Sequence, residues 1–534
     1  GGAGRGDGLQ LNCVQPLMQG TTVTGSEKPL PMVDPRLIAA CKQRNPRFGG
    51  ANAAQDVTPV TPPPVPPQAH AASPGSPNIV FILTDDLAMN LVQYMPHVLQ
   101  MQKDGATFAN YFVTDSLCCP SRSSIFTGRY PHDTGVFKNV GNEGGYIVFK
   151  QRGNEQGSFA VTLTAAGYRT AFLGKYLNGY EPRQHSAGPG WTHWLVAGNG
   201  YPEFRYALNQ DGQIVQHGFK AEDYLTDVLA TDAARFIKQK SDKPFFIEAA
   251  TFAPHAPYTP APRDADAFPG LRAPRTQAYN TAADAAAPHW LLQHRALDQK
   301  DIDDIDRDFR KRAQSVLAVD KVIAQLQSAV AEIGQAQNTY FVFSSDNGYH
   351  MGEFRLMPGK MTAYDTDIHV PLVITGPTVP AGRTFEEIVE NVDLNPTFNG
   401  LAGATTFPFA DGASLAPIWQ GGRADEWRGT ALIEHHGPLN DPVDPDLPSP
   451  RSGNPTSYSA IRARGWLYVE YADGEKEYHD LVSDPFELHN TYSTLSNEDK
   501  GTLHAALEAT VHCHDAKTCW AAQRTPHLGV KKSQ

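Results

Sequence analysis

The residues most suited to chemistry lie in the stretch from Leu117 to Arg129, which reads LCCPSRSSIFTGR. Cys118 offers a potential nucleophile, and Arg122 adds a positive charge close by. Pro120 is typical of the first turn of a helix, where its missing N–H is not needed. Cys118 is then expected at a helix N-terminus, where backbone N–H groups favour an anion. The stretch predicts a place that binds and attacks a negatively charged group; a buried, inert cysteine pair is the alternative.

Two groups of oxygen-bearing side chains follow predicted buried strands. Asp85 and Asp86 come after one apolar run, and Asp346 and Asn347 come after another. Carboxylate and amide oxygens suit a hard divalent cation such as Ca²⁺ or Mg²⁺. Either pair alone also fits a turn or a helix N-cap. Two pairs at matching strand ends favour the cation site.

The stretch from Cys118 to Arg129 resembles the signature of the sulfatase family, Cys-x-Pro-Ser-Arg followed by Thr-Gly-Arg. The resemblance implies a sulfuric ester hydrolase with an alkaline-phosphatase-like α/β fold. It also implies that a formylglycine-generating enzyme oxidises Cys118 to formylglycine, whose hydrate is the nucleophile. The implied cation is Ca²⁺, with Mg²⁺ as the alternative. Its implied ligands are Asp85, Asp86, the modified Cys118, Asp346 and Asn347.

The same resemblance assigns roles to four further positions. Lys175, in a Gly-Lys pair at a predicted strand end, matches a lysine that binds the sulfate. Lys360 matches the second such lysine, and His255 matches the histidine that contacts the bridging ester oxygen as general acid. Arg122 orients the nucleophile. Without the family context, a solvated strand end and a loop histidine fixed between prolines are the alternatives for Lys175 and His255.

One position departs from the family pattern. Many sulfatases have a histidine two residues after the first lysine, whereas this chain has Leu177. The resemblance therefore does not identify the group that deprotonates the second hydroxyl of the nucleophile. The Gly-Lys-Tyr-Leu-Asn form resembles the branch of N-acetylglucosamine-6-sulfatases and extracellular heparan endosulfatases. By that match the candidate substrate-binding residues are His132, Asn139, Asn178 and His350. For His132 and His350, structural hydrogen bonding is an equal alternative.

The surrounding pattern predicts the elements that position these residues. Apolar runs over 78–83, 170–173, 244–250 and 341–343 indicate buried strands, and helical periodicity separates them. Polar residues gather where the strands end, as expected for ligand sites in α/β sheets. We therefore expect a large mixed, mostly parallel sheet flanked by helices, with a small C-terminal antiparallel subdomain. The predicted parts are an irregular Pro-rich extension (1–76), a catalytic domain (77–430) and the C-terminal subdomain with a terminal helix (431–534).

Composition limits the other possibilities. The net charge of −12 argues against nonspecific nucleic-acid binding, and no apolar run is long enough for a membrane span. Six cysteines predict disulfides 13–41 and 513–519, with the central pair free, which indicates an oxidising compartment. No signal peptide stands at the start, as in a processed mature form. Each Asn-x-Ser/Thr match carries an excluded proline, which favours a bacterial, secreted or periplasmic protein.

The predicted partner is a sulfated small molecule or sugar, with N-acetylglucosamine-6-sulfate suggested by the branch resemblance. A second enzyme hypothesis is a phosphonate monoester or phosphodiester hydrolase, which is a relative with the same cation site. A third is a binding protein in which Cys118 is never converted. Sulfate is favoured by the signature together with Lys175, Lys360 and His255.

Overall fold

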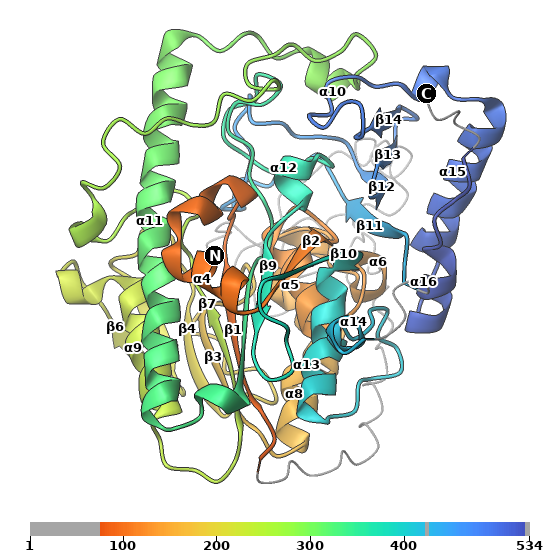
Figure 1. Cartoon of the computed structure of the whole chain (residues 1–534). Helices are drawn as coiled ribbons and strands as arrows, with labels where there is room; N and C mark the ends of the chain where they lie inside the picture. Colours follow the sequence, from red (N-terminus) through yellow and green to blue (C-terminus); the bar gives the residue numbers. More distant parts are fainter. Residues whose placement is uncertain (1–74, 422–426, 529–534) are drawn as a thin grey trace, which may run out of the picture. The chain divides into compact units, whose positions relative to one another are not determined.

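The computed structural model describes residues 75–421 and 427–528, and its largest element is a ten-stranded sheet (Figure 1). The strand order is β10-β2-β9-β8-β1-β7-β3-β4-β5-β6. Only β9 and β5 run against the other strands, so the sheet is mixed and mostly parallel, as predicted. The strands are β1 (Asn78–Thr84), β2 (Ala106–Phe112), β3 (Arg169–Lys175), β4 (His193–Ala197), β5 (Ala207–Gln210), β6 (Gln213–Gln216), β7 (Phe245–Ala250), β8 (Thr339–Ser345), β9 (Leu372–Thr375) and β10 (Arg383–Glu390).

The central strands are apolar because helices cover both faces of the sheet. Along β1, Phe81 and Leu83 join one hydrophobic core, and Val80 and Ile82 join the other. Helices α5 (Cys118–Thr127), α7 (Gly145–Gln151), α8 (Phe159–Ala165) and α13 (Leu394–Ala402) cover the first face. Helices α4 (Pro96–Asp104), α9 (Leu225–Ile237) and α11 (Gln299–Glu332) cover the second. The predicted buried strands are therefore confirmed.

The long helix α11 begins well before the periodic apolar positions that predict it. Its N-cap is Asp298, whose side chain accepts a hydrogen bond from the backbone N–H of Asp301. The side chain of Asp301 accepts from the backbone of Asp298 in return, which makes a capping box. The remaining short helices are α6 (Pro131–Thr134), α10 (His289–Leu292), α12 (Asp365–Ile368) and α14 (Ala416–Trp419). No helix in the described ranges is long and apolar enough to cross a membrane.

Strands at the edges of the main sheet carry weak sequence signals. The β10 sequence, RTFEEIVE, is largely exposed at its start, and β6 is exposed along most of its length. A strand that buries only part of its surface needs no continuous apolar run. The sequence therefore predicts the central strands better than the edges.

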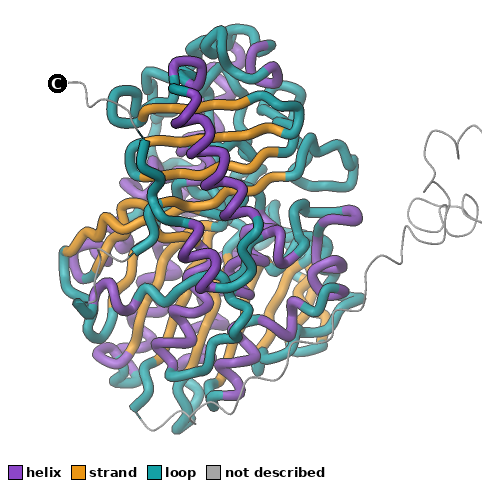
Figure 2. Tube along the Cα trace, turned by 90° about the vertical axis from the view of Figure 1, so that its right-hand side faces the viewer, coloured by secondary structure: helices purple, strands orange, loops and turns teal. Residues whose placement is uncertain are grey.

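A separate four-stranded antiparallel sheet follows the main sheet in the chain. Its strands are β11 (Thr430–His435), β12 (Tyr458–Ala463), β13 (Trp466–Tyr471) and β14 (Lys476–Asp480), in sequential order. Helix α15 (Asn497–Val511) packs on one face of this sheet, and Figure 2 shows a helix crossing the smaller sheet's strands. The other face contributes to the core of the main sheet. The antiparallel C-terminal sheet and its terminal helix are as predicted.

A disulfide links Cys513 to Cys519, and helix α16 (Ala516–Ala522) lies across this short loop. Cys118 and Cys119 are free, as expected. The predicted pair Cys13–Cys41 lies outside the described residues, as does most of the predicted N-terminal extension. The divisions of the chain after residues 76 and 430 stay predictions.

Glu248 is a buried carboxylate in the middle of β7. It stands in register between Phe81 of β1 and Phe172 of β3, and both aromatic rings belong to the same core. Neither of its carboxylate oxygens has a hydrogen-bond partner among the described residues. Burial raises its pKa from 4.5 to about 8. Between these two pH values, Glu248 is therefore protonated in the folded protein and ionised in the unfolded chain.

We expect Glu248→Gln to stabilise the protein increasingly as the pH rises from 5 to 8. Because the pKa of Glu248 is raised on folding, the wild-type free energy of unfolding falls across this window. The glutamine amide does not titrate, so the free energy of unfolding of the variant lacks this fall. Near pH 8 it exceeds that of the wild type by on the order of 4 kcal/mol. Thermal denaturation of both proteins at several pH values measures it. Parallel melting-temperature curves for the two proteins would refute the assignment.

Candidate active site

Most of the predicted site residues lie at the carboxyl ends of four neighbouring parallel strands. Asp346 follows β8, Asp85 follows β1, His255 lies in the loop after β7, and Lys175 is the last residue of β3. Neighbouring strands lie about 4.8 Å apart, so residues at four adjacent strand ends converge. The expected clustering at one edge of the sheet is therefore what the structure shows.

Helix α5 brings Cys118 to this cluster. Leu117 is its extended N-cap, so Cys118 is the first helical residue, as predicted. The Cys118 Sγ lies 3.1 Å from Asp85 Oδ1 and 2.9 Å from Lys360 Nζ. Burial raises the pKa of the Cys118 thiol well above its ordinary value, and nearby carboxylates, first that of Asp346, add to the rise. An unmodified Cys118 is then protonated and a weak nucleophile at neutral pH.

Three buried cations surround the cysteine. Lys175 Nζ donates to Asp85 Oδ2 at 2.6 Å, and Lys360 Nζ donates to an oxygen of Asp86 at 2.7 Å. Arg122 Nε donates to Asp346 Oδ2 at 2.8 Å, and its Nη1 donates to the Lys175 carbonyl oxygen at 2.7 Å. Burial alone would lower the pKa of both lysines, but neighbouring carboxylates raise it well above its ordinary value. The three side chains are therefore charged and suit an anionic group.

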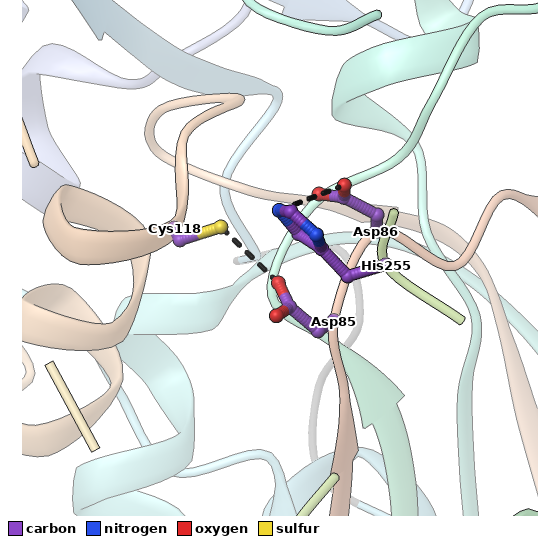
Figure 3. Close-up of side chains that lie close together, drawn as sticks. All are labelled: Asp85, Asp86, Cys118 and His255. Carbon is purple, nitrogen blue, oxygen red and sulfur yellow. Dashed lines mark hydrogen bonds and ion pairs between the residues drawn. The ribbon is translucent and has the colours of Figure 1, made fainter. Parts of the chain in front are cut away.

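The ligand atoms present also fit a cation. One atom each from Asp85, Asp86, Cys118 and His255 lie within 4.8 Å of one another, and Figure 3 shows these side chains converging. Asn347 Nδ2 donates to Asp86 Oδ1 at 2.7 Å, while its Oδ1 is buried without a hydrogen-bond partner. A buried amide oxygen without a hydrogen-bond donor costs free energy unless a ligand such as a cation binds it. The oxygen-rich set fits Ca²⁺ or Mg²⁺.

His255 contributes an imidazole ring to the cluster from the loop after β7. Its Nδ1 is 2.8 Å from the Ala256 carbonyl oxygen, so Nδ1 carries a proton, and Nε2 faces the site. Nε2 is 2.6 Å from Asp446 Oδ1 and 3.6 Å from Asp86 Oδ2. Burial would lower the pKa of His255, but the carboxylates of Asp86, Asp85 and Asp446 raise it above its ordinary value. The ring is thus suited to hold a proton at Nε2.

Two of the four predicted substrate-binding residues lie at this cluster. Asn139 Oδ1 accepts from the backbone N–H of Cys119 at 2.9 Å, and its Nδ2 donates to Asp446 Oδ2 at 2.6 Å. Asn178 Nδ2 donates to the hydroxyl of Tyr201 at 3.4 Å, and its Oδ1 is buried without a partner. Tyr201 itself lies against both Lys175 and His255. Asn139 and Asn178 therefore line the region around the reacting groups.

The structure does not bring His132 or His350 into this cluster. The His132 ring nitrogens lie 2.8 Å from Glu434 Oε2 and 2.8 Å from the Cys513 carbonyl oxygen. The His350 ring bonds the carboxylate of Asp367 and, at 2.8 Å, the Ser452 carbonyl oxygen. Both imidazoles have both nitrogens engaged in structural hydrogen bonds. Leu177 packs in the hydrophobic core and offers no proton acceptor.

Sequence reasoning missed a pair of acids that complete the site. Asp444 and Asp446 lie in the irregular segment between β11 and β12, within the letters NDPVDPDLP. Burial would raise the pKa of Asp446, but Lys360 and His255 hold it well below its ordinary value. Burial and the neighbouring charge of Asp446 raise the pKa of Asp444 to about 6. Alternating Asp and Pro predict only a turn-rich loop, and nothing local shows where that loop packs.

Arg312 was also missed, because it lies far along the chain on the face of α11. Its guanidinium donates to the backbone carbonyl of Asp86 and, at 3.4 Å, to that of Pro254. It also stacks over the ring of Tyr349, at 4.3 Å from the centroid. One buried side chain thus joins the loop of a cation ligand to the loop of His255.

We expect Arg312→Met to lower kcat by about a hundredfold, since displacement of reacting groups by about 1 Å can cost that much. The melting temperature should fall as well, because two carbonyl oxygens lose a charged donor. Steady-state kinetics and thermal denaturation measure the two effects. Arg307→Met, on an exposed part of the same helix, is the matched control. Wild-type kcat in Arg312→Met would contradict this role.

The comparisons with known proteins show the family of this chain. Residues 77–404 match the sulfatase family model, and residues 352–512 match the model for the C-terminal part of N-sulphoglucosamine sulphohydrolase. The chain is 34% identical to human N-acetylglucosamine-6-sulfatase over 490 residues, covering 85% of this chain and 87% of that protein. It is 35% identical to the Drosophila melanogaster extracellular sulfatase SULF-1 homolog, covering 69% of this chain and 34% of that protein. The chain belongs to the sulfatase family.

Solved structures share its fold. One is a protein in complex with its substrate D-glucosamine-2-N,6-O-disulfate, with a TM-score of 0.66 and 23% identity, covering 82% of this chain and 97% of that one. Another is the phosphonate monoester hydrolase of Agrobacterium radiobacter, with a TM-score of 0.61 and 20% identity, covering 81% of this chain and 94% of that one. The family match and the relatives together show that the chain is a sulfuric ester hydrolase.

Proposed function

We propose that this sulfatase hydrolyses the 6-O-sulfate of an N-acetylglucosamine-type sugar, with formylglycine at position 118 as the nucleophile. The observation that carries the proposal is the position of Cys118, the first residue of α5, held against Asp85 and Lys360 and surrounded by buried cations. The relatives named N-acetylglucosamine-6-sulfatase support the sugar. The relatives named as extracellular sulfatases support secretion of this protein.

The chain's own residues would each supply one part of the reaction. Lys175 and Lys360 neutralise the sulfate oxygens, which makes attack on an anion feasible. Arg122 fixes Asp346 and the Lys175 backbone, so the start of α5 stays aligned with the strand ends. The protonated His255 Nε2 gives its proton to the departing alcohol oxygen.

The cation would be held by Asp85, Asp86, Asp346, Asn347 and residue 118. When bound, the cation and the hydrated formylglycine supply the polarised oxygen nucleophile that a thiol does not. The unpartnered Asn347 Oδ1 supports this ligand set. Thermal denaturation after chelation and readdition of Ca²⁺ or Mg²⁺ tests it. We expect a cation-dependent rise in melting temperature that Asn347→Ala reduces; no rise with either ion would contradict the ligand set.

Two measurements test the proposed function. Mass spectrometry of the peptide spanning residue 118 should show the aldehyde in place of the thiol. Turnover is then compared on N-acetylglucosamine-6-sulfate, 4-nitrophenyl sulfate and an aryl phosphonate monoester. Preference for the sulfates supports the proposal, whereas preference for the phosphonate would support the phosphonate hydrolase hypothesis. An intact thiol with no turnover would support a binding protein.

A further inference from the structure

A loop of the C-terminal region reaches into the active site. This loop, residues 439–454, is called the acidic loop here. Its two ends are tied together, because the backbone N–H of Leu439 donates to Asn454 Oδ1 at 2.8 Å and Asn454 Nδ2 donates back at 2.7 Å. Within it, Asp444 Oδ1 accepts from the backbone N–H of Asp446 at 2.9 Å. These hydrogen bonds tie the ends of the acidic loop together and fix Asp444 beside Asp446.

Asp446 makes direct contacts with groups that would handle the substrate. Its Oδ1 lies 2.6 Å from His255 Nε2 and 3.2 Å from Lys360 Nζ. Its Oδ2 accepts from Asn139 Nδ2 at 2.6 Å, and the same amide nitrogen lies 3.2 Å from Asp444 Oδ1. A carboxylate thus occupies the anion-binding position between the proposed general acid and a proposed sulfate-binding lysine.

The exposure of the site residues differs from one side of the cluster to the other. Cys118 and Asp85 are fully buried, whereas His255 is 7% and Asp446 is 8% exposed. Val443, beside the two acids in the acidic loop, is 70% exposed. Among the charged side chains of the cluster, the small exposure is greatest at His255 and Asp446. We therefore place the alcohol of a sulfate ester whose sulfur lies at residue 118 on the side of His255 and Asp446.

This geometry sets up a competition. A bound sulfate takes hydrogen bonds from Lys360, and the ester oxygen takes the His255 proton, so Asp446 Oδ1 loses both partners while Asn139 Nδ2 still donates to Oδ2. A buried carboxylate oxygen without a donor is costly. The cost is removed only if the departing alcohol itself carries hydrogen-bond donors close to the ester. A second anionic group at the same place would add repulsion.

We propose that Asp446, assisted by Asp444, is a specificity-determining residue that accepts hydrogen bonds from the leaving alcohol and rejects substrates with an anionic group beside the ester. The proposal rests on the sulfatase function proposed above. The substrate class is a sulfate monoester with a hydroxyl or ammonium group close to the ester, as the 4-hydroxyl group is in a 6-sulfated N-acetylglucosamine. An ester flanked by a carboxylate or a second sulfate is disfavoured.

The test compares two aryl sulfates that differ in the group next to the ester, 2-(aminomethyl)phenyl sulfate and 2-carboxyphenyl sulfate. The ratio of their kcat/KM values is measured for wild type, Asp446→Asn and Asp441→Asn. Comparing the ratio between proteins cancels the different intrinsic reactivities of the two esters. We expect Asp446→Asn to shift the ratio about a hundredfold towards the carboxylate. Asp441→Asn, in the same loop but with its carboxylate on the backbone N–H of Val443, should leave it unchanged.

A purely structural role for Asp446 predicts a different result. Binding of the two matching unreactive arylmethanesulfonates, in which a CH₂ group replaces the ester oxygen, is measured by calorimetry, and we expect the same shift in their affinity ratio. These analogues need no general acid. If the carboxylate only orients His255, Asp446→Asn leaves the affinity ratio at the wild-type value, which overturns the proposal. If the wild type turned over no sulfate ester but still discriminated between the two analogues in binding, the proposed function would be contradicted and the role of Asp446 would not. Asp444→Asn, with a smaller shift in the same direction, serves if Asp446→Asn does not fold.

Discussion

We expect Cys118→Ala to fold and to bind a divalent cation, but to lose sulfate ester hydrolysis by at least about 10⁴-fold. The side chain at position 118 is the one group in the proposed mechanism that attacks sulfur. Around it, Lys175 pairs with Asp85 and Lys360 pairs with Asp86, and neither ion pair requires the side chain at position 118. Initial rates on 4-nitrophenyl sulfate measure the loss, and thermal denaturation with and without Ca²⁺ checks the fold.

Cys119→Ala is the matched control for that experiment. Cys119 is equally buried, and its link to the site is its backbone N–H, which donates to Asn139 Oδ1 and is unaffected by the substitution. We expect its activity to stay within about threefold of wild type, with a melting temperature lowered by the small cavity. If Cys118→Ala retained wild-type turnover, or if Cys119→Ala lost it, the nucleophile would be wrongly assigned.

His255→Gln has the second largest expected effect, and this effect depends on the leaving group. The glutamine can still donate a hydrogen bond to Asp446, but it cannot release a proton. Hydrolysis of a sugar sulfate, whose alcohol needs that proton, should fall by about 10²–10⁴-fold. Hydrolysis of 4-nitrophenyl sulfate, whose phenolate leaves unaided, should fall by less than about tenfold. Parallel kcat measurements on the two substrates give the comparison.

The pH dependence gives a separate check on His255. Because its pKa is raised above the ordinary value, the wild-type rate on a sugar sulfate should hold through neutral pH and fall as the pH rises through that pKa. The variant should lack this fall. His289→Ala, an exposed histidine outside the site, controls for unspecific effects. Equal losses on both substrates would argue that His255 has only a structural role.

Most of the site could be predicted from sequence because its residues follow strong local signals. The signature around Cys118 contains its own helix start, and Asp85 and Lys175 stand directly at the ends of apolar strands. A strand that is buried on both faces is apolar along nearly its whole length, so the end of the strand can be recognised in the sequence. Adjacent parallel strands then bring such ends together without any further information. The central fold and the core of the site follow from these facts.

The tertiary structure alone decided what surrounds that core. Asp446 and Arg312 lie far from the signature in the chain, in a proline-rich loop and on one turn of a long helix. Their local patterns fit a turn and a half-buried helix face, and neither pattern encodes its packing partner. His132 and His350 show the converse, since motif position suggested a pocket while hydrogen bonds to Glu434 and Asp367 engage their rings. By itself the sequence determined the reacting group and the strand ends around it, because both are local. The folded chain decided which distant side chains face them, because those contacts depend on long-range packing.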